Sequence, residues 1–143
     1  MSRIISTESG TQLRNKLSKA IVFSIRELSS QDIDEIKRKE YSAFIYLALK
    51  EISETVDKSA SAWEKRDYWV KADRFRMEWE WSKNISDQLE TILLEGNWED
   101  FPILMMQTMQ KLNKVKVSPR SRVGKPWIGA WARFEEVVNG KKS

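Results

Sequence analysis

Apolar residues recur at helical spacing along most of the chain. Between Thr11 and Leu28 they fall three or four residues apart, and Ser29 and Asp32 precede a longer stretch of the same pattern that fades near Lys58. Such spacing places side chains on one face of an α-helix. The pattern therefore predicts a first amphipathic helix up to Leu28 and a second, longer helix whose N-terminal signal is the Ser29 segment.

A third helix is predicted from Trp63 to Leu94. Ser61 and Glu64 have the spacing of a capping box, and Gly96 is a common type of helix end. One unbroken helix through the preceding Ser-Ala segment is the alternative. Apolar side chains occupy well over half the circumference of this helix, so we expect it to be covered on several sides, as the central helix of a bundle or by a second subunit.

The last part of the chain predicts two shorter helices joined by a basic segment. Asp100 and Pro102 indicate the start of a fourth helix that runs to about Val115. A basic linker region, residues 111–126, contains proline and glycine and leads to a short C-terminal helix over residues 127–139. Glycine inside so short a helix lowers its stability, so we expect this helix to need packing against the rest of the chain or a partner.

Composition supports an all-α fold. The chain has 143 residues with only five Gly and three Pro, too few for a turn every ten residues as in a β protein. We therefore predict a single domain, residues 1–143, built as an up-and-down bundle of four main helices plus the short C-terminal helix. The longest apolar run has seven residues, 43–49, and no secretory leader is visible, so we expect no transmembrane segment and a cytoplasmic location.

The chain contains no His and no Cys, which removes many catalytic mechanisms. Zinc sites made from these residues, Ser-His-Asp triads and Cys nucleophiles are excluded, and no glycine-rich phosphate loop is present. Carboxylate, Lys, Ser or Tyr chemistry remains, together with oxygen-ligated Mg²⁺ and binding without chemistry. We expect no cofactor and, on balance, no enzymatic activity.

Positive charge is concentrated near the C-terminus. Residues 111–143 contain nine basic and two acidic side chains, whereas residues 1–110 contain 16 basic and 19 acidic ones. Basic side chains hold phosphates and aromatic rings stack on unpaired bases, so this segment suits RNA or single-stranded nucleic acid. The predicted contacts are Lys114, Lys116, Arg120, Arg122 and Lys125, with Trp127 as a stacking group.

Four carboxylates have the spacing of a metal site. Glu51-x-x-Glu54 and Glu64-x-x-Asp67 each place two carboxylates on one helical face. This arrangement resembles the Mg²⁺ motif of the all-α nucleotide pyrophosphohydrolases, although the segment between the two pairs is short and contains Lys. The simpler interpretation is exposed helix carboxylates paired with lysines.

Two tryptophans and a methionine cluster stand out as contact residues. Trp69 falls in the polar arc of the third helix and Trp98 in a turn, so both are predicted to anchor a partner. Met105, Met106 and Met109 are interpreted first as core filler and second as an adaptable contact surface. The leading hypothesis is a non-enzymatic helical protein that binds a protein partner, itself or both, as an accessory subunit or scaffold.

Overall fold

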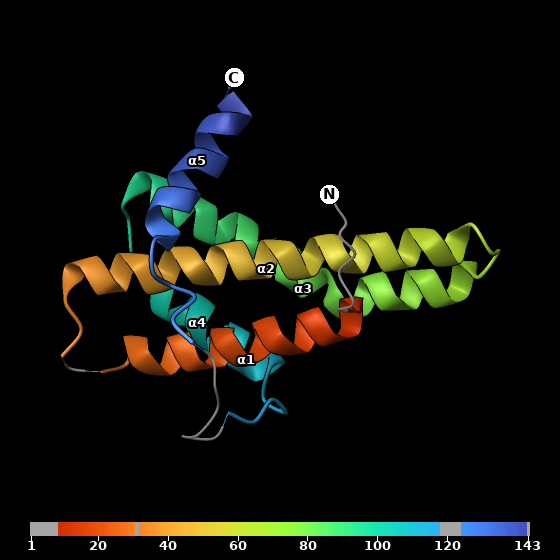
Figure 1. Ribbon diagram of the computed structural model, residues 1–143, viewed down its shortest axis with the longest axis horizontal. Helices are drawn as coiled ribbons and strands as arrows, with labels where there is room; N and C mark the ends of the chain where they lie inside the picture. Colours follow the sequence, from red (N-terminus) through yellow and green to blue (C-terminus); the bar gives the residue numbers. More distant parts are fainter. Residues whose placement is uncertain (1–8, 31, 118–123, 143) are drawn as a thin grey trace.

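The computed structural model describes residues 9–30, 32–117 and 124–142, and within these ranges the chain is helical and contains no strand. The five helices are α1 (Gly10–Leu28), α2 (Glu35–Glu64), α3 (Trp69–Glu95), α4 (Phe101–Lys111) and α5 (Ala130–Lys142). The predicted all-α fold class is therefore confirmed. Figure 1 shows α1, α2 and α3 lying along the long axis with alternating direction, while α5 crosses α2 at a steep angle.

Side-chain caps fix where α1 and α2 begin. Ser9 and Gln12 form a capping box at the start of α1, each side chain accepting a backbone N–H of the other residue. The predicted start signal of the second helix, Ser29 with Asp32, is wrong. Asp34 caps α2 instead, accepting the N–H of Lys37 at 2.7 Å.

The predicted break near Lys58 does not occur, because α2 continues through the Ser-Ala segment to Glu64. Ala60 is completely buried there, so the small side chains serve helix packing. The turn to α3 lies at residues 65–68, where Asp67 adopts a positive φ of 66°. The capping-box spacing of Ser61 and Glu64 therefore lies inside a helix.

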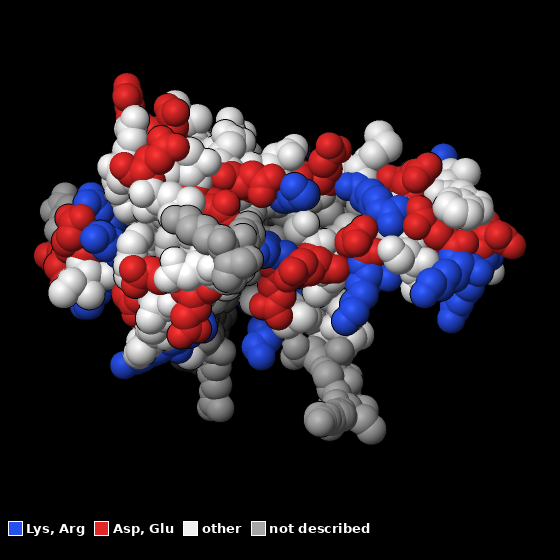
Figure 2. Space-filling model, turned by 90° about the horizontal axis from the view of Figure 1, so that it is seen from above, with Lys and Arg blue, Asp and Glu red and all other residues white. Residues whose placement is uncertain are grey.

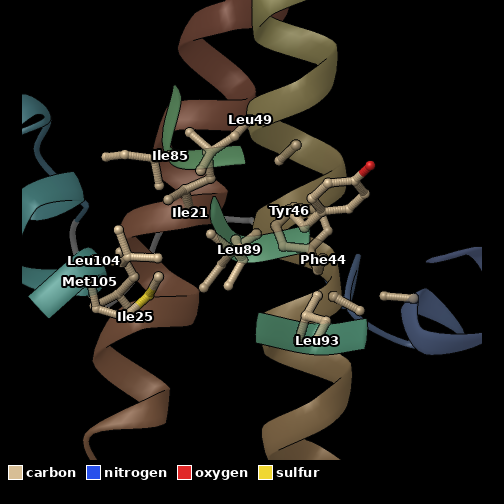
Figure 3. Packing of buried hydrophobic residues seen from close by; sticks show 14 of the residues in the cluster. Ile21, Ile25, Phe44, Tyr46, Leu49, Ile85, Leu89, Leu93, Leu104 and Met105 are labelled. Carbon is tan, nitrogen blue, oxygen red and sulfur yellow. The ribbon is translucent and has the colours of Figure 1, made fainter. Parts of the chain in front are cut away.

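The core lies where α1, α2, α3 and α4 meet, and α5 extends it over α2. Figure 3 shows Ile21 of α1 near Leu49 of α2 and Leu89 of α3, while Ile25 of α1 lies beside Leu104 and Met105 of α4. α2 is the central helix, since it packs against α1, α3 and α5. Of the two arrangements expected for the third helix, central in a bundle or covered by a second subunit, the first is therefore not the one observed. The N-terminal part of α3 is left partly uncovered.

The last two helices are placed differently from the prediction. α4 ends at Lys111 and not near Val115, and α5 begins at Ala130 and continues through Gly140. Gly129 has a positive φ of 78°, a conformation that glycine adopts without steric cost, so it lies in the turn before the helix and not inside it.

Aromatic packing attaches α5 to the rest of the molecule. Phe134 is buried and meets the ring of Tyr46 edge to face, with centroids 5.3 Å apart. Just before the helix, the ring of Trp127 packs against Phe23 of α1 and Tyr41 of α2. None of the helices in the described ranges has both the length and the apolar character required to cross a membrane.

Candidate functional site

The end of the α2–α3 hairpin exposes three consecutive apolar residues. In Figure 1 this end extends beyond the start of α1, so among the described helices only α2 and α3 reach it. Tyr68, Trp69 and Val70 are 55%, 56% and 64% exposed. The structure thus places Trp69 in solvent, as its position in the polar arc predicted.

The base of this hairpin end is held by an ion-pair network. The guanidinium of Arg76 on α3 donates to both carboxylate oxygens of Glu64 and to Asp57 and Ser61 on α2. The hydrogen bond from Arg76 lowers the pKa of the Glu64 carboxyl below its ordinary value. The network fixes the position of α3 against α2 just below the exposed residues.

Ring contacts stiffen the same region. Trp63 meets Phe75 edge to face at 5.0 Å, and the ammonium of Lys71 lies 4.4 Å from the centre of the Trp63 ring. Trp63 and Phe75 come from different helices. The exposed residues at the hairpin end therefore stand on a base that is already packed.

The four predicted metal-binding carboxylates do not form a metal site. Glu64 is engaged by Arg76, whereas Glu51, Glu54 and Asp67 are exposed, and Asp67 is part of the α2–α3 turn. Within the described part of the chain, no group of three or more acidic residues is arranged to hold a metal ion. The geometry supports the simpler interpretation of surface carboxylates, and Glu64 has an arginine as its partner.

The predicted nucleic-acid contacts differ in their exposure to solvent. Lys114, Lys116 and Lys125 are exposed, and Arg120 and Arg122 lie outside the described residues. Trp127 is half-buried, with its ring centre 4.8 Å from that of Tyr41 and 5.7 Å from that of Phe23. Its ring already stacks within the protein, so the geometry does not support a role in stacking on bases.

Two segments of the sequence contain no carboxylate, and their described parts lie side by side on the molecule. Residues 9–26 and 101–134 contain basic side chains but no Asp or Glu. α1 packs against α4, and the guanidinium of Arg26 donates to the carbonyl oxygen of Val117 at 3.1 Å, which brings the segments together. We call this surface the carboxylate-free face. The exposed cations in the described parts of the two segments are Lys16, Lys19, Arg26, Lys111, Lys114, Lys116, Lys125 and Arg133.

A second face of the molecule has a mixed charge. Figure 2 views the molecule from the side of α2 and α5, and there acidic and basic side chains are interspersed along the α2–α3 hairpin. A surface of mixed sign does not attract a polyanion, whereas adjacent segments with only basic side chains do. Because the acidic residues lie on α2 and α3, the mixed-charge surface of the hairpin differs from the carboxylate-free face.

Trp98 does not resemble Trp69 in its surroundings. Its ring packs against Phe101 at 4.9 Å, and the Arg38 guanidinium lies 5.1 Å from its centre. Trp98 is half-buried at the edge of the core. Its predicted role as a partner anchor is therefore less favoured by the geometry than that of Trp69.

Sequence reasoning missed one carboxylate that organises the fold. Glu40 of α2 accepts the backbone N–H groups of Gly129 and Trp131, and Lys39 lies 5.2 Å from the centre of the Trp131 ring. No pattern in the sequence connects these residues, because they are separated by about ninety positions.

The comparisons with family models, with curated proteins and with solved structures gave no match.

Proposed function

We propose that this chain is a non-enzymatic helical binding protein that acts as an accessory subunit or scaffold in a larger assembly. The observation that carries the proposal is the row of exposed residues Tyr68, Trp69 and Val70 at the end of the α2–α3 hairpin. Aromatic residues on a preformed base are typical anchors of protein interfaces, because little conformational entropy is lost on binding. The Arg76 network provides such a base.

The test is a comparison of two matched double variants in the native cell extract. Trp69→Ser with Val70→Ser removes the hairpin anchors, and Leu94→Ser with Ile128→Ser removes similarly exposed apolar residues elsewhere. We expect a stoichiometric protein partner to be lost from the first variant and kept by the control, with and without nuclease. Identical partners for both variants contradict the proposal.

The same variants test self-association. Light scattering after gel filtration measures the mass of the wild-type protein over a range of concentrations. A mass of two chains that falls to one chain in the Trp69→Ser, Val70→Ser variant assigns the hairpin end to a second copy. A dimer that persists in this variant assigns self-association to another surface.

The carboxylate-free face supports a second function, the binding of RNA or single-stranded DNA. Lys114 and Lys116 contact phosphates in this hypothesis, so replacing both by Ala reduces the salt slope of binding by about 1.4. The control, Lys58→Ala with Lys83→Ala, removes the same charge from the mixed surface. Arg120→Ala with Arg122→Ala tests the sequence-predicted contacts that lie outside the described residues. If the affinity for nucleic acid is unchanged by salt and by all these variants, this function is contradicted.

A further inference from the structure

A groove of about 510 Å³ lies between α1 and α4, away from the hairpin end. One wall comes from Ile25 and Leu28 of α1 and the other from four residues of α4, and Arg26, Ser29, Arg38 and Phe101 complete the lining. The four α4 residues are Pro102, Met105, Met106 and Met109. The groove is thus mainly apolar, and among its described lining residues the charged side chains are two arginines, Arg26 and Arg38.

The spacing of the α4 wall fits a helical ligand. Its four residues follow one another at i, i+3, i+4 and i+7, so they form a stripe along one flank of α4. The stripe rises by roughly 10 Å, about two helical turns. An amphipathic helix that binds in a groove places its own apolar anchors at the same intervals.

Methionine gives this wall an adaptable surface. Met105 is buried, whereas Met106 is 64% exposed and Met109 is half-buried. Unbranched thioether side chains repack around different apolar partners, which makes them common on surfaces that bind helices. Met106 therefore projects where an incoming helix would first make contact.

Charge determines which helix fits. Arg26 and Arg38 line the groove, no Asp or Glu is among its described lining residues, and its α4 wall comes from a carboxylate-free segment. Arg38 pairs with Glu35 at 2.8 Å, but both side chains are exposed, and such pairs contribute little stability. A carboxylate on a ligand would meet these two guanidinium groups, whereas a basic ligand would be repelled by them.

We propose that this groove binds an acidic amphipathic helix of a partner protein. The apolar face of that helix lies against the methionine stripe, and its carboxylates face Arg26 and Arg38. The inference rests on the proposed binding function and specifies the chemistry of the partner. It concerns a surface distinct from the hairpin end, so the two proposals can fail separately.

The test uses two synthetic peptides of about 18 residues, long enough to form a helix on binding. Both carry leucines at i, i+3, i+4 and i+7, and they differ only in having Glu or Lys on the flanking positions. Fluorescence anisotropy of a dye on each peptide measures binding to the full chain. We expect the Glu peptide to bind at least about tenfold more tightly at low salt and to weaken as salt is added.

Two methionine variants locate the binding site. Met106→Glu places a carboxylate in the groove, and Met77→Glu makes the same change at a methionine of α3 that is also largely exposed. We expect the Glu peptide to bind Met106→Glu about tenfold more weakly and Met77→Glu unchanged. Met106→Leu restores an apolar side chain and keeps binding, and circular dichroism checks that each variant remains helical.

Several results would overturn the proposal. These are equal binding of the two peptides, no binding of either, or a Met106→Glu variant that binds as well as Met77→Glu. If neither peptide binds, but the wild-type protein binds phosphatidylserine vesicles and Met106→Glu abolishes that binding, the proposal is wrong and the groove binds a membrane surface instead. None of these results bears on the hairpin end. If the Trp69→Ser, Val70→Ser variant loses its protein partner in the cell extract, the hairpin proposal is still supported.

Discussion

The carboxylate of Glu40 in α2 accepts a hydrogen bond of 2.8 Å from the backbone N–H of Trp131 in the first turn of α5. Its other oxygen accepts the N–H of Gly129 at 2.6 Å. The first N–H groups of a helix have no partner within the helix, and a negative charge is favoured beside them. A residue of another helix thus caps α5, and this cap couples the position of α5 to that of α2.

Replacing Glu40 by Gln should therefore loosen α5. The amide keeps one acceptor oxygen but loses the charge and the second acceptor, so we expect a loss of roughly 1–2 kcal/mol in the free energy of unfolding. Faster hydrogen exchange at the Trp131 amide would locate the effect. Glu51→Gln, at an exposed position of the same helix, serves as the control. Equal stability and exchange in both variants would show that the cap contributes little.

The sequence predicted what depends on local periodicity. The first helix is predicted to within a residue of α1, because its apolar stripe depends only on local spacing, and the capping box of Ser9 that the structure shows acts at the same short range. The same local rules misplaced the end of α2. Ser61 and Glu64 have the spacing of a cap, but Ala60 is buried by packing against the core and keeps the segment helical.

The candidate site was predictable only where exposure follows from helical position. Trp69 lies in solvent as expected, since it falls on the polar side of α3. Trp98 and Trp127 are half-buried because side chains from other parts of the chain reach them, Arg38 in the case of Trp98 and Phe23 and Tyr41 in the case of Trp127. The groove between α1 and α4 and the cap by Glu40 depend on tertiary contacts of the same kind.

Arg14 is a buried cation whose charge should be dispensable for stability. It is only 7% exposed, donates to Thr55 and Thr11, and lies over the ring of Phe75. Among the described residues no carboxylate is within ion-pair distance of it. Burial lowers the pKa of its guanidinium, although Glu78 acts in the opposite direction.

We therefore expect Arg14→Met to be within about 1 kcal/mol of the wild type or more stable, because a methionine of similar length needs no charge desolvation. Arg14→Ala removes the stem that packs in this position and should cost roughly 2 kcal/mol. Urea denaturation measures both. If Met destabilises the protein as much as Ala, the charge of Arg14 is required after all.

The Glu64–Arg76 pair should make stability depend on acid pH. Arg76 lowers the pKa of Glu64 in the folded state, so the pair stabilises the fold above the ordinary carboxyl pKa. This contribution is lost as the pH falls through the lower folded-state pKa. Glu64→Gln should reduce the thermal midpoint at pH 7, and the difference from wild type should close in acid. A difference that is equally large at both pH values would contradict this assignment.

Tyr46 should produce the opposite dependence in alkali. Its ring is almost completely buried and its hydroxyl donates to Glu90. Burial first, and then the hydrogen bond to Glu90, raise the pKa of Tyr46 well above its ordinary value of 10. The unfolded chain therefore releases this proton near pH 10 while the folded chain keeps it, and stability must fall as the pH rises above 10.

Tyr46→Phe isolates this effect, because Phe keeps the edge-to-face contact with Phe134 and lacks only the hydroxyl. At pH 7 we expect the variant to be less stable by about 1 kcal/mol, the contribution of one hydrogen bond. Above pH 10 the wild type should lose up to about 1.4 kcal/mol per pH unit more than the variant, so the two stability curves converge. Tyr41, whose pKa burial also raises, is present in both proteins and cancels in the difference. Urea denaturation between pH 7 and pH 11 gives both curves, and parallel curves would show that Tyr46 ionises in the folded protein as readily as in the unfolded chain.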